Sequence, residues 1–291
     1  MKQVRWWDLF FFLSPAFFIM FFVALVPFVF AVVLSLTDMN LMYPSPPKFV
    51  GLQNFVELIH DKRFINALRN TFLFVTSSVL LELLLGLFLA YVIFISSKGF
   101  IRSILILFIA FPMMLPRVTT GLLWKFLYNP LFSPIGFLFQ KIGVTFAPLS
   151  SPDTALFAVV FADFWQWTPF FILILLSGLE ALPSSLFESA SIDGASEKQK
   201  FLYVVFPMLK PIIWIAVMFR IIDALRTFDT IYVMTGGGPG ISTETLDIYA
   251  YLIGISQGGR ISYATAAAFV LLAISIAISS VLVKYFKEGE Y

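Results

Sequence analysis

The chain has 291 residues, of which 60% are hydrophobic, 18% aromatic and only 12% charged. A soluble domain has about 25% charged residues, so this composition excludes a soluble enzyme with a polar surface, a nucleic-acid-binding protein and a disordered chain. The absence of cysteine and the single histidine, His60, exclude disulfides, cysteine nucleophiles and a histidine zinc site, so we expect a membrane protein without a bound metal.

Long charge-poor runs mark the expected membrane spans, because a helix needs about 20 apolar residues to cross a hydrocarbon core of about 30 Å. Six segments are predicted to span: 9–37, 69–98, 103–125, 155–179, 204–225 and 260–284. The first and last have uncharged interiors, whereas Glu82, Arg117 and Asp163 each interrupt one of the others. The segment 204–225 contains several charged residues and proline, and it is included because six spans return the chain to its starting side. The sequence therefore predicts an all-α polytopic membrane protein with six transmembrane helices.

The orientation follows from the basic residues. The run 9–37 is longer than the core of a signal peptide, which has about 7–15 residues, so it is expected to be an uncleaved first span. If this span starts in the cytoplasm, lysine and arginine are denser in the inner connections than in the outer ones. By the positive-inside rule we expect both termini to be cytoplasmic, with residues 50–65 and 236–245 outside, in the cell (inner, cytoplasmic) membrane.

The only sizeable inner connection, residues 181–203, is predicted to form two short helices. Two capping boxes are expected, one at Ser185 and Glu188 and the other at Ser196 and Gln199. Gly194 between them allows a positive φ and a sharp turn. The segment is therefore expected to be a helix–turn–helix elbow, and an ordinary interhelical loop is the alternative that the local pattern leaves open.

This connection reads Glu-Ser-Ala-Ser-Ile-Asp-Gly-Ala at 188–195, followed by Phe-Pro-Met-Leu-Lys-Pro at 206–211. It resembles the EAA loop of the permease subunits of binding-protein-dependent ABC importers, with Ser189 where the family has Ala. Trp-Gln-Trp-Thr-Pro at 165–169 and Thr-Gly-Gly-Gly-Pro at 235–239 are similar to the sugar branch of that family, which includes the maltose and glycerol-phosphate permeases. The resemblance covers approximately residues 50–288.

The resemblance implies the type I ABC-importer permease fold, with an N-terminal helix and first outer loop in 1–68 and a permease core in 69–288. It implies four kinds of partner: a second homologous permease in a heterodimer, two ATP-binding subunits, an extracellular or periplasmic sugar-binding protein, and membrane lipid. The residues implied to couple transport to the ATPase are Glu188, Ala190, Asp193, Gly194 and Ala195. The chain has no Gly-x-x-x-x-Gly-Lys-Ser/Thr pattern, so ATP hydrolysis is expected to belong to a separate subunit, and no cofactor is expected.

Ionisable residues inside membrane spans are costly and usually face a cavity or a charged partner. The substrate path is therefore expected among Glu82, Arg117, Asp163, Trp165, Gln166, Trp167 and Asp223. The aromatic rings are expected to stack on a sugar and the polar groups to bind its hydroxyls. In the competing interpretation these residues only pair with one another, Arg220 with Asp223 and Glu82 with Arg117, while the aromatic side chains face lipid.

Three functions remain open at this point. A permease of a sugar importer agrees with all the motifs together, whereas a permease for another solute would agree with the inner loop alone. Two repeated halves with broken helices would favour an ion-coupled secondary transporter, but the sequence has no convincing internal repeat. No nucleophile and base, and no set of metal ligands, can be assembled for an enzyme.

Overall fold

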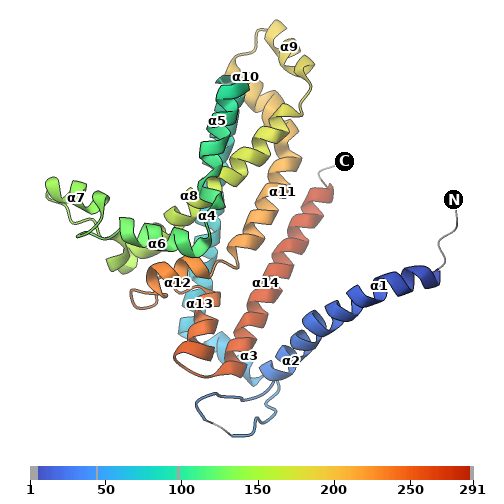
Figure 1. Ribbon diagram of the computed structural model, residues 1–291, viewed down its shortest axis with the longest axis vertical. Helices are drawn as coiled ribbons and strands as arrows, with labels where there is room; N and C mark the ends of the chain where they lie inside the picture. The colour runs from blue at the N-terminus through green and yellow to red at the C-terminus, as the bar shows by residue number, and fades with distance from the viewer. Residues whose placement is uncertain (1–5, 44, 97–98, 289–291) are drawn as a thin grey trace. The chain divides into compact units, whose positions relative to one another are not determined.

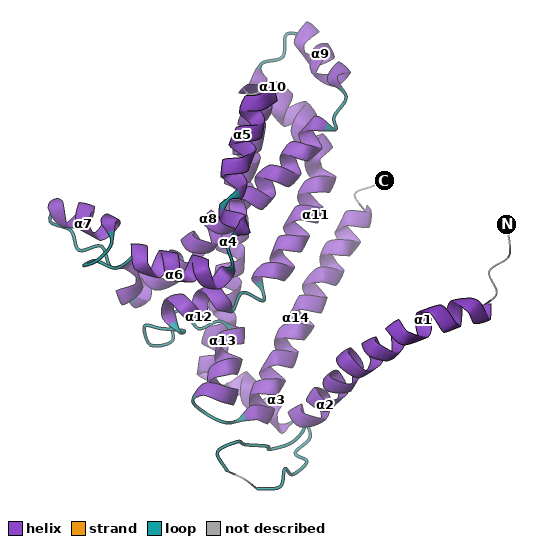
Figure 2. Ribbon diagram, in the orientation of Figure 1, coloured by secondary structure: helices purple, strands orange, loops and turns teal. Residues whose placement is uncertain are grey.

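The computed structural model describes residues 6–43, 45–96 and 99–288. These residues are mainly helical (Figure 1, Figure 2), and their only bridge of β type joins Thr37 to Phe49. The chain forms two compact units: Met1–Phe64 with Tyr249–Val270, and Ile65–Ile248 with Leu271–Tyr291. The predicted all-α fold is confirmed, and the predicted division between residues 68 and 69 stays a prediction.

The elements of the first unit come from the two ends of the chain. They are α1 (Trp6–Met20), a π-helical turn (Phe21–Leu25), α2 (Val26–Ser35), α3 (Gln53–His60), a second π-helical turn (Leu252–Ser256) and the first part of α14 (Ile261–Glu288). Asn54 on α3 is buried and donates from its amide nitrogen to the carbonyls of Ser35 and Thr37, both at 2.8 Å. The first outer loop is thereby tied to the end of α2.

The second unit contains most of the helices, both long and short. They are α4 (Lys62–Ser96), α5 (Gly99–Ala110), α6 (Arg117–Leu127), α7 (Pro134–Lys141), α8 (Pro152–Glu180), α9 (Ser184–Ile192), α10 (Glu197–Lys200), α11 (Phe206–Ala224), α12 (Asp229–Thr235) and the start of α13 (Leu246–Tyr251). Helix α8 packs against α5, α6, α11 and α12, and more than half of its residues are buried. Gly86 allows α4 to approach α8 closely, since a Cβ there would lie 2.4 Å from the Cβ of Phe171.

Five helical segments of the described residues are long and apolar enough to cross a membrane: Phe10–Ser35, Lys62–Ser96, Pro152–Glu180, Glu197–Ala224 and Ile261–Lys284. They correspond to five of the six predicted spans. The second of them begins seven residues before its predicted start, and its predicted end, residues 97–98, lies outside the described residues.

The prediction of one continuous helix over 103–125 is wrong. Helix α5 ends at Ala110, a short 3-10 turn covers Pro112–Met114, and α6 begins at Arg117. The cause is the pair Pro112 and Pro116, because a proline has no N–H to donate and disfavours helical backbone in the residue before it. The break places Arg117 at the first position of a helix instead of in the middle of one.

Candidate functional site

A cluster of five charged side chains lies inside the second unit. It brings together Glu82 of α4, Arg117 of α6, Asp163 of α8 and the pair Arg220 and Asp223 of α11. We call this set the ion-pair cluster. Residues more than a hundred positions apart meet there because α8 packs against α11 and α6.

Arg220 is the centre of the cluster. Its Nε donates to Oε2 of Glu82 at 2.8 Å and its Nη2 to Oε1 at 2.9 Å, so the two groups form a bidentate pair. The same Nη2 donates to Oδ2 of Asp163, and Nη1 donates to Oδ2 of Asp223 at 3.1 Å. The side chains of Glu82, Asp163 and Arg220 are at most 1% exposed.

The expected pair of Glu82 with Arg117 is therefore wrong, since Glu82 binds Arg220, while the expected pair of Arg220 with Asp223 is confirmed. A buried carboxylate needs a hydrogen-bonded counter-charge, because each unpaired ion costs several kcal/mol. One guanidinium supplies this to two buried carboxylates. Arg220 thus joins α4, α8 and α11 through charged hydrogen bonds.

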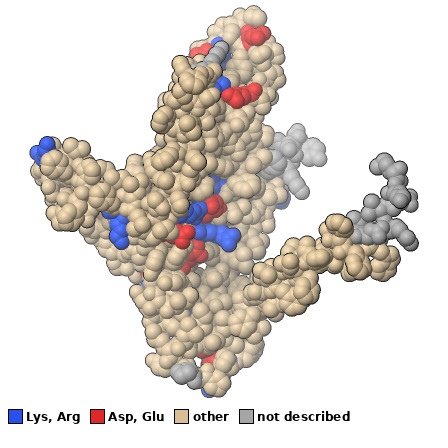
Figure 3. Space-filling view, viewed as in Figure 1, with Lys and Arg blue, Asp and Glu red and all other residues tan. Residues whose placement is uncertain are grey.

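The outer part of the cluster is the pair of Arg117 and Asp223. Arg117 donates from Nη2 to both carboxylate oxygens of Asp223 at 2.5 Å, and from Nη1 to Oγ1 of Thr227 at 3.1 Å. The side chain of Arg117 is 20% exposed and that of Asp223 is 38% exposed. Figure 3 shows acidic and basic side chains gathered on the surface near the ends of α6, α11 and α12, with uncharged surface around them. The cluster therefore reaches the surface at this pair.

The aromatic residues of the predicted path lie against other side chains. The guanidinium carbons of Arg117 and Arg220 lie 5.4 Å and 5.2 Å from the ring centre of Trp167, within the range of a cation–π contact. Trp165 makes an edge contact with Trp124, with ring centres 5.7 Å apart. Stacking of a sugar on either ring stays a prediction.

Gln166 holds the break between α5 and α6 in place. Its Nε2 donates to the carbonyl of Leu115 at 2.7 Å, just before the helix that carries Arg117. Its Oε1 and the Nε1 of Trp167 are buried without a hydrogen-bond partner among the described residues. Four of the seven predicted path residues are therefore members of the cluster, and Trp167 lies against its two arginines. Gln166 binds the segment before α6, and Trp165 contacts Trp124 instead of the cluster.

The predicted elbow forms in the second unit as well (Figure 1). Helices α9 and α10 flank Gly194, whose φ is 74°, so the predicted turn is confirmed. The capping box of Ser196 and Gln199 is present. The one expected at Ser185 is not, because the N-cap of α9 lies two residues earlier, at Pro183, and no side chain caps the helix.

The elbow exposes some of the residues predicted to couple transport to the ATPase. Glu188, Asp193 and Gly194 are exposed, whereas Ala190 and Ala195 are half-buried. Phe187 packs against Phe94 of α4 with ring centres 5.4 Å apart, and Tyr91 donates to Oε2 of Glu197 at 3.1 Å. A groove of about 810 Å³ beside the elbow includes Glu188 and Lys200 in its wall. The elbow is thus anchored to α4 at both of its helices.

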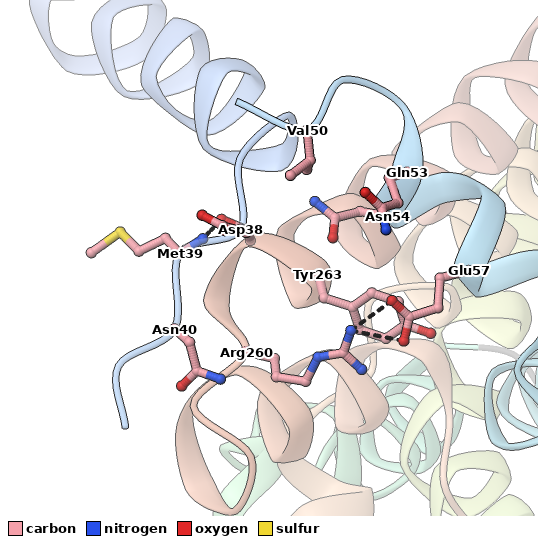
Figure 4. Close-up of a pocket in the computed structure, with 10 residues that line it drawn as sticks. Asp38, Met39, Asn40, Val50, Gln53, Asn54, Glu57, Arg260 and Tyr263 are labelled. Carbon is pink, nitrogen blue, oxygen red and sulfur yellow. Dashed lines mark hydrogen bonds and ion pairs between the residues drawn. The ribbon is translucent and has the colours of Figure 1, made fainter. Parts of the chain in front are cut away.

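A smaller pocket of about 270 Å³ lies in the first unit, which sequence reasoning missed because its residues come from two distant parts of the chain. Figure 4 shows Arg260 and Glu57 facing each other beside the ring of Tyr263. Arg260 donates to both carboxylate oxygens of Glu57 at 2.7 Å and lies 4.0 Å from the centre of the Tyr263 ring. Arg260 and Glu57 neutralise each other, and Asp38, which also lines the pocket, accepts a hydrogen bond from the backbone N–H of Lys48 at 2.6 Å.

The chain is similar to known transport proteins in sequence and in fold. Residues 82–288 match the family described as the inner membrane component of binding-protein-dependent transport systems. The chain is 36% identical over 85% of its length to the trehalose/maltose transport system permease protein MalF of Thermococcus litoralis, covering 82% of that protein. It is 32% identical over 80% of its length to the sn-glycerol-3-phosphate transport system permease protein UgpA of Agrobacterium fabrum, covering 78% of it. A chain of a bacterial ABC transporter that imports the acidic polysaccharide alginate superposes with a TM-score of 0.84 at 21% identity, over 97% of this chain and 96% of that one.

Proposed function

Because the chain belongs to the inner membrane components of binding-protein-dependent transport systems, we propose that it is the permease subunit of an ATP-driven importer that translocates a sugar delivered by an extracellular binding protein. The observation that carries this proposal is the ion-pair cluster. It places charged groups between spanning helices and lets two of them reach the surface. Such groups in a membrane protein indicate a polar path, and the similarity to a trehalose/maltose permease supports a sugar as the cargo.

The ATP that drives import is hydrolysed by separate subunits in this proposal. The elbow at 181–203 would transmit their motion, with Glu188, Asp193 and Gly194 in the exposed contact and Ala190 and Ala195 in its packing. Its position beyond the ends of α5, α8 and α11 in Figure 1 supports a contact outside the membrane. The anchoring of both short helices to α4 supports transmission of force into the helix that carries Glu82.

The complete importer would contain a second homologous permease and two ATP-binding subunits in the cell (inner) membrane, with both termini of this chain in the cytoplasm. A binding protein is supported by a related structure of the alginate transporter, which was solved in complex with a periplasmic protein bound to an alginate pentasaccharide. A non-sugar cargo is the second candidate, and the similarity to a glycerol-3-phosphate permease favours it.

Uptake into vesicles tests the proposal. The importer is reconstituted with its ATPase and binding protein, and ATP-dependent accumulation of labelled maltose, trehalose and glycerol-3-phosphate is compared. We expect accumulation of a sugar that stops when ATP is omitted. Accumulation of glycerol-3-phosphate without any sugar would favour the second candidate, and accumulation without ATP but with an ion gradient would contradict the importer itself.

A further inference from the structure

The ion-pair cluster contains more acidic than basic groups. Its members are three carboxylates and two guanidiniums: Glu82, Asp163, Asp223, Arg117 and Arg220. The carboxyl groups therefore at least balance the two guanidiniums, even if one of the three is protonated, so the cluster has no net positive charge. Interactions between charges in its buried part are screened much less than in water.

Arg117 is the basic group of the cluster that a ligand reaches, and three of its five N–H donors bind neighbouring side chains. Its Nη2 contacts both oxygens of Asp223 at 2.5 Å and its Nη1 contacts Thr227 at 3.1 Å. Arg220 is only 1% exposed. An anionic ligand that approaches Arg117 would therefore meet a guanidinium whose charge Asp223 already neutralises.

Asp223 is also difficult to displace. It is held by Arg117 and by Nη1 of Arg220 at 3.1 Å, so moving it away would disturb the buried half of the cluster. A neutral hydroxylated ligand has no need to displace it. A carboxylate has about four lone-pair sites, and the two arginines use three of those of Asp223. One hydroxyl group can therefore still donate to Oδ1 while both ion pairs remain.

We propose that the ion-pair cluster selects uncharged saccharides against acidic ones, and that Asp223 is the residue that sets this preference. The inference rests on the proposed function as a sugar permease and adds the charge class of the sugar. Asp223 neutralises the accessible guanidinium, so the cluster offers no net positive charge to an acidic sugar.

The test measures binding to the assembled importer in lipid nanodiscs, without the binding protein, so that the preference belongs to the membrane subunits. The probes are maltotriose and trigalacturonate, which have the same number of sugar units and differ in charge. Their dissociation constants are obtained by saturation-transfer NMR titration at neutral pH. We expect the wild-type importer to bind maltotriose at least tenfold more tightly than trigalacturonate.

Variants assign the preference to this residue. Asp223→Asn removes the negative charge and is expected to reduce the preference to about threefold or less, whereas Asp223→Glu should keep it. Arg117→Gln removes a positive charge and is expected to increase the preference. Asp153→Asn, an exposed acid in the first turn of α8, is the matched control and should bind both probes as the wild type does.

The possible outcomes distinguish failure of the proposed selectivity from failure of the proposed function as a sugar permease. Equal binding of both probes by the wild type, an unchanged preference in Asp223→Asn, or detectable binding of neither probe would overturn the selectivity while sugar uptake in vesicles continued. Absence of sugar uptake altogether would instead overturn the proposed function. If Asp223→Asn failed to assemble, Arg117→Gln would still test the selectivity, because its preference for maltotriose should increase. No increase in that variant would overturn the proposal.

Discussion

A single guanidinium holds together three helices of the second unit. Arg220 is fully buried and shares its donors among Glu82, Asp163 and Asp223. A buried ion pair adds little stability compared with apolar residues of the same volume, but removing one partner leaves the other charge unpaired at a cost of about 3–5 kcal/mol. Arg220 therefore affects stability mainly through what its loss would leave behind.

The first prediction is that Arg220→Met strongly destabilises the protein, by about 3–5 kcal/mol, because it leaves Glu82 and Asp163 buried without a counter-charge. Thermal unfolding of the detergent-solubilised protein, followed by loss of monodisperse material, measures this. The control Arg69→Met changes an exposed arginine of α4 and should have little effect. Adding Glu82→Gln to Arg220→Met should restore part of the stability, and a double variant no more stable than the single one would contradict the electrostatic explanation.

In the first unit, the acidic residue Asp61 links segments that are distant in the sequence. Its Oδ2 accepts hydrogen bonds from the hydroxyls of Tyr249 at 2.5 Å and Tyr263 at 3.0 Å. Its Oδ1 accepts from the backbone N–H groups of Arg63 and Phe64 at the start of α4. Burial raises the pKa of Asp61, but the hydrogen bonds from Tyr249, Arg63, Tyr263 and Phe64 outweigh it and lower the pKa below 3.8.

The second prediction concerns the stability that Asp61 contributes. Because its pKa is lower in the folded protein than in the unfolded chain, the contribution is complete well above pH 3.8 and is lost as the pH falls through the folded-state value. Thermal unfolding of wild type and Asp61→Asn between neutral pH and pH 3 measures the difference. We expect the gap in unfolding temperature to be constant near neutrality and to narrow in acid. A gap that widens on acidification would show that the sign is wrong.

Among the elements, those marked by composition or by a local turn signal could be predicted, and those that depend on distant contacts could not. Four of the five long apolar helices follow from charge-poor length, and the one over 204–225 follows from the even number of spans. The elbow follows from Gly194 and the cap at Ser196. The break between α5 and α6 could be predicted from Pro112 and Pro116, but the apolar composition of 103–125 favoured one continuous helix. The partner of Glu82 could not be predicted, because nothing in the local sequence distinguishes Arg117 from Arg220. The choice depends on how the helices pack together.

The third prediction belongs to the elbow. Gly194 has a φ of 74°, which a β-branched residue adopts only with strain, although a Cβ there would meet no other atom. Gly194→Val should therefore insert normally in the membrane but reduce sugar uptake and ATPase docking, because the turn between α9 and α10 is distorted. Co-purification of the ATPase and uptake in vesicles measure the two effects.

The matched control for this variant is Gly143→Val. Gly143 also has a positive φ, 75°, and open space around it, but it follows α7 and lies outside the elbow. It should suffer similar local strain while keeping ATPase docking. Normal docking and uptake by Gly194→Val would remove the case for an elbow at this position.

For the whole molecule, the number of membrane crossings depends on the segment that the prolines interrupt. Five helices are long enough to cross by themselves, whereas α5 has 12 residues and would span only about 18 Å at about 1.5 Å per residue. An odd number of crossings would place the two termini on opposite sides of the membrane. The predicted common side therefore requires that α5, the turn at Pro112–Met114 and α6 cross together.

The fourth prediction is that they do cross, so that both termini and the elbow lie in the cytoplasm. Cysteine labelling is clean because the native chain has no cysteine. In Gly194→Cys and Lys284→Cys, an impermeant thiol reagent should react only after the cells are permeabilised, whereas in Ile241→Cys it should react in intact cells. In His60→Cys, an exposed position before the interrupted segment, the reagent should also react in intact cells. Labelling of only one of the 60 and 241 variants in intact cells would mean that the interrupted segment does not cross. Arg117 would then lie at the membrane surface, and the exposed side of the ion-pair cluster could not line a path through the bilayer.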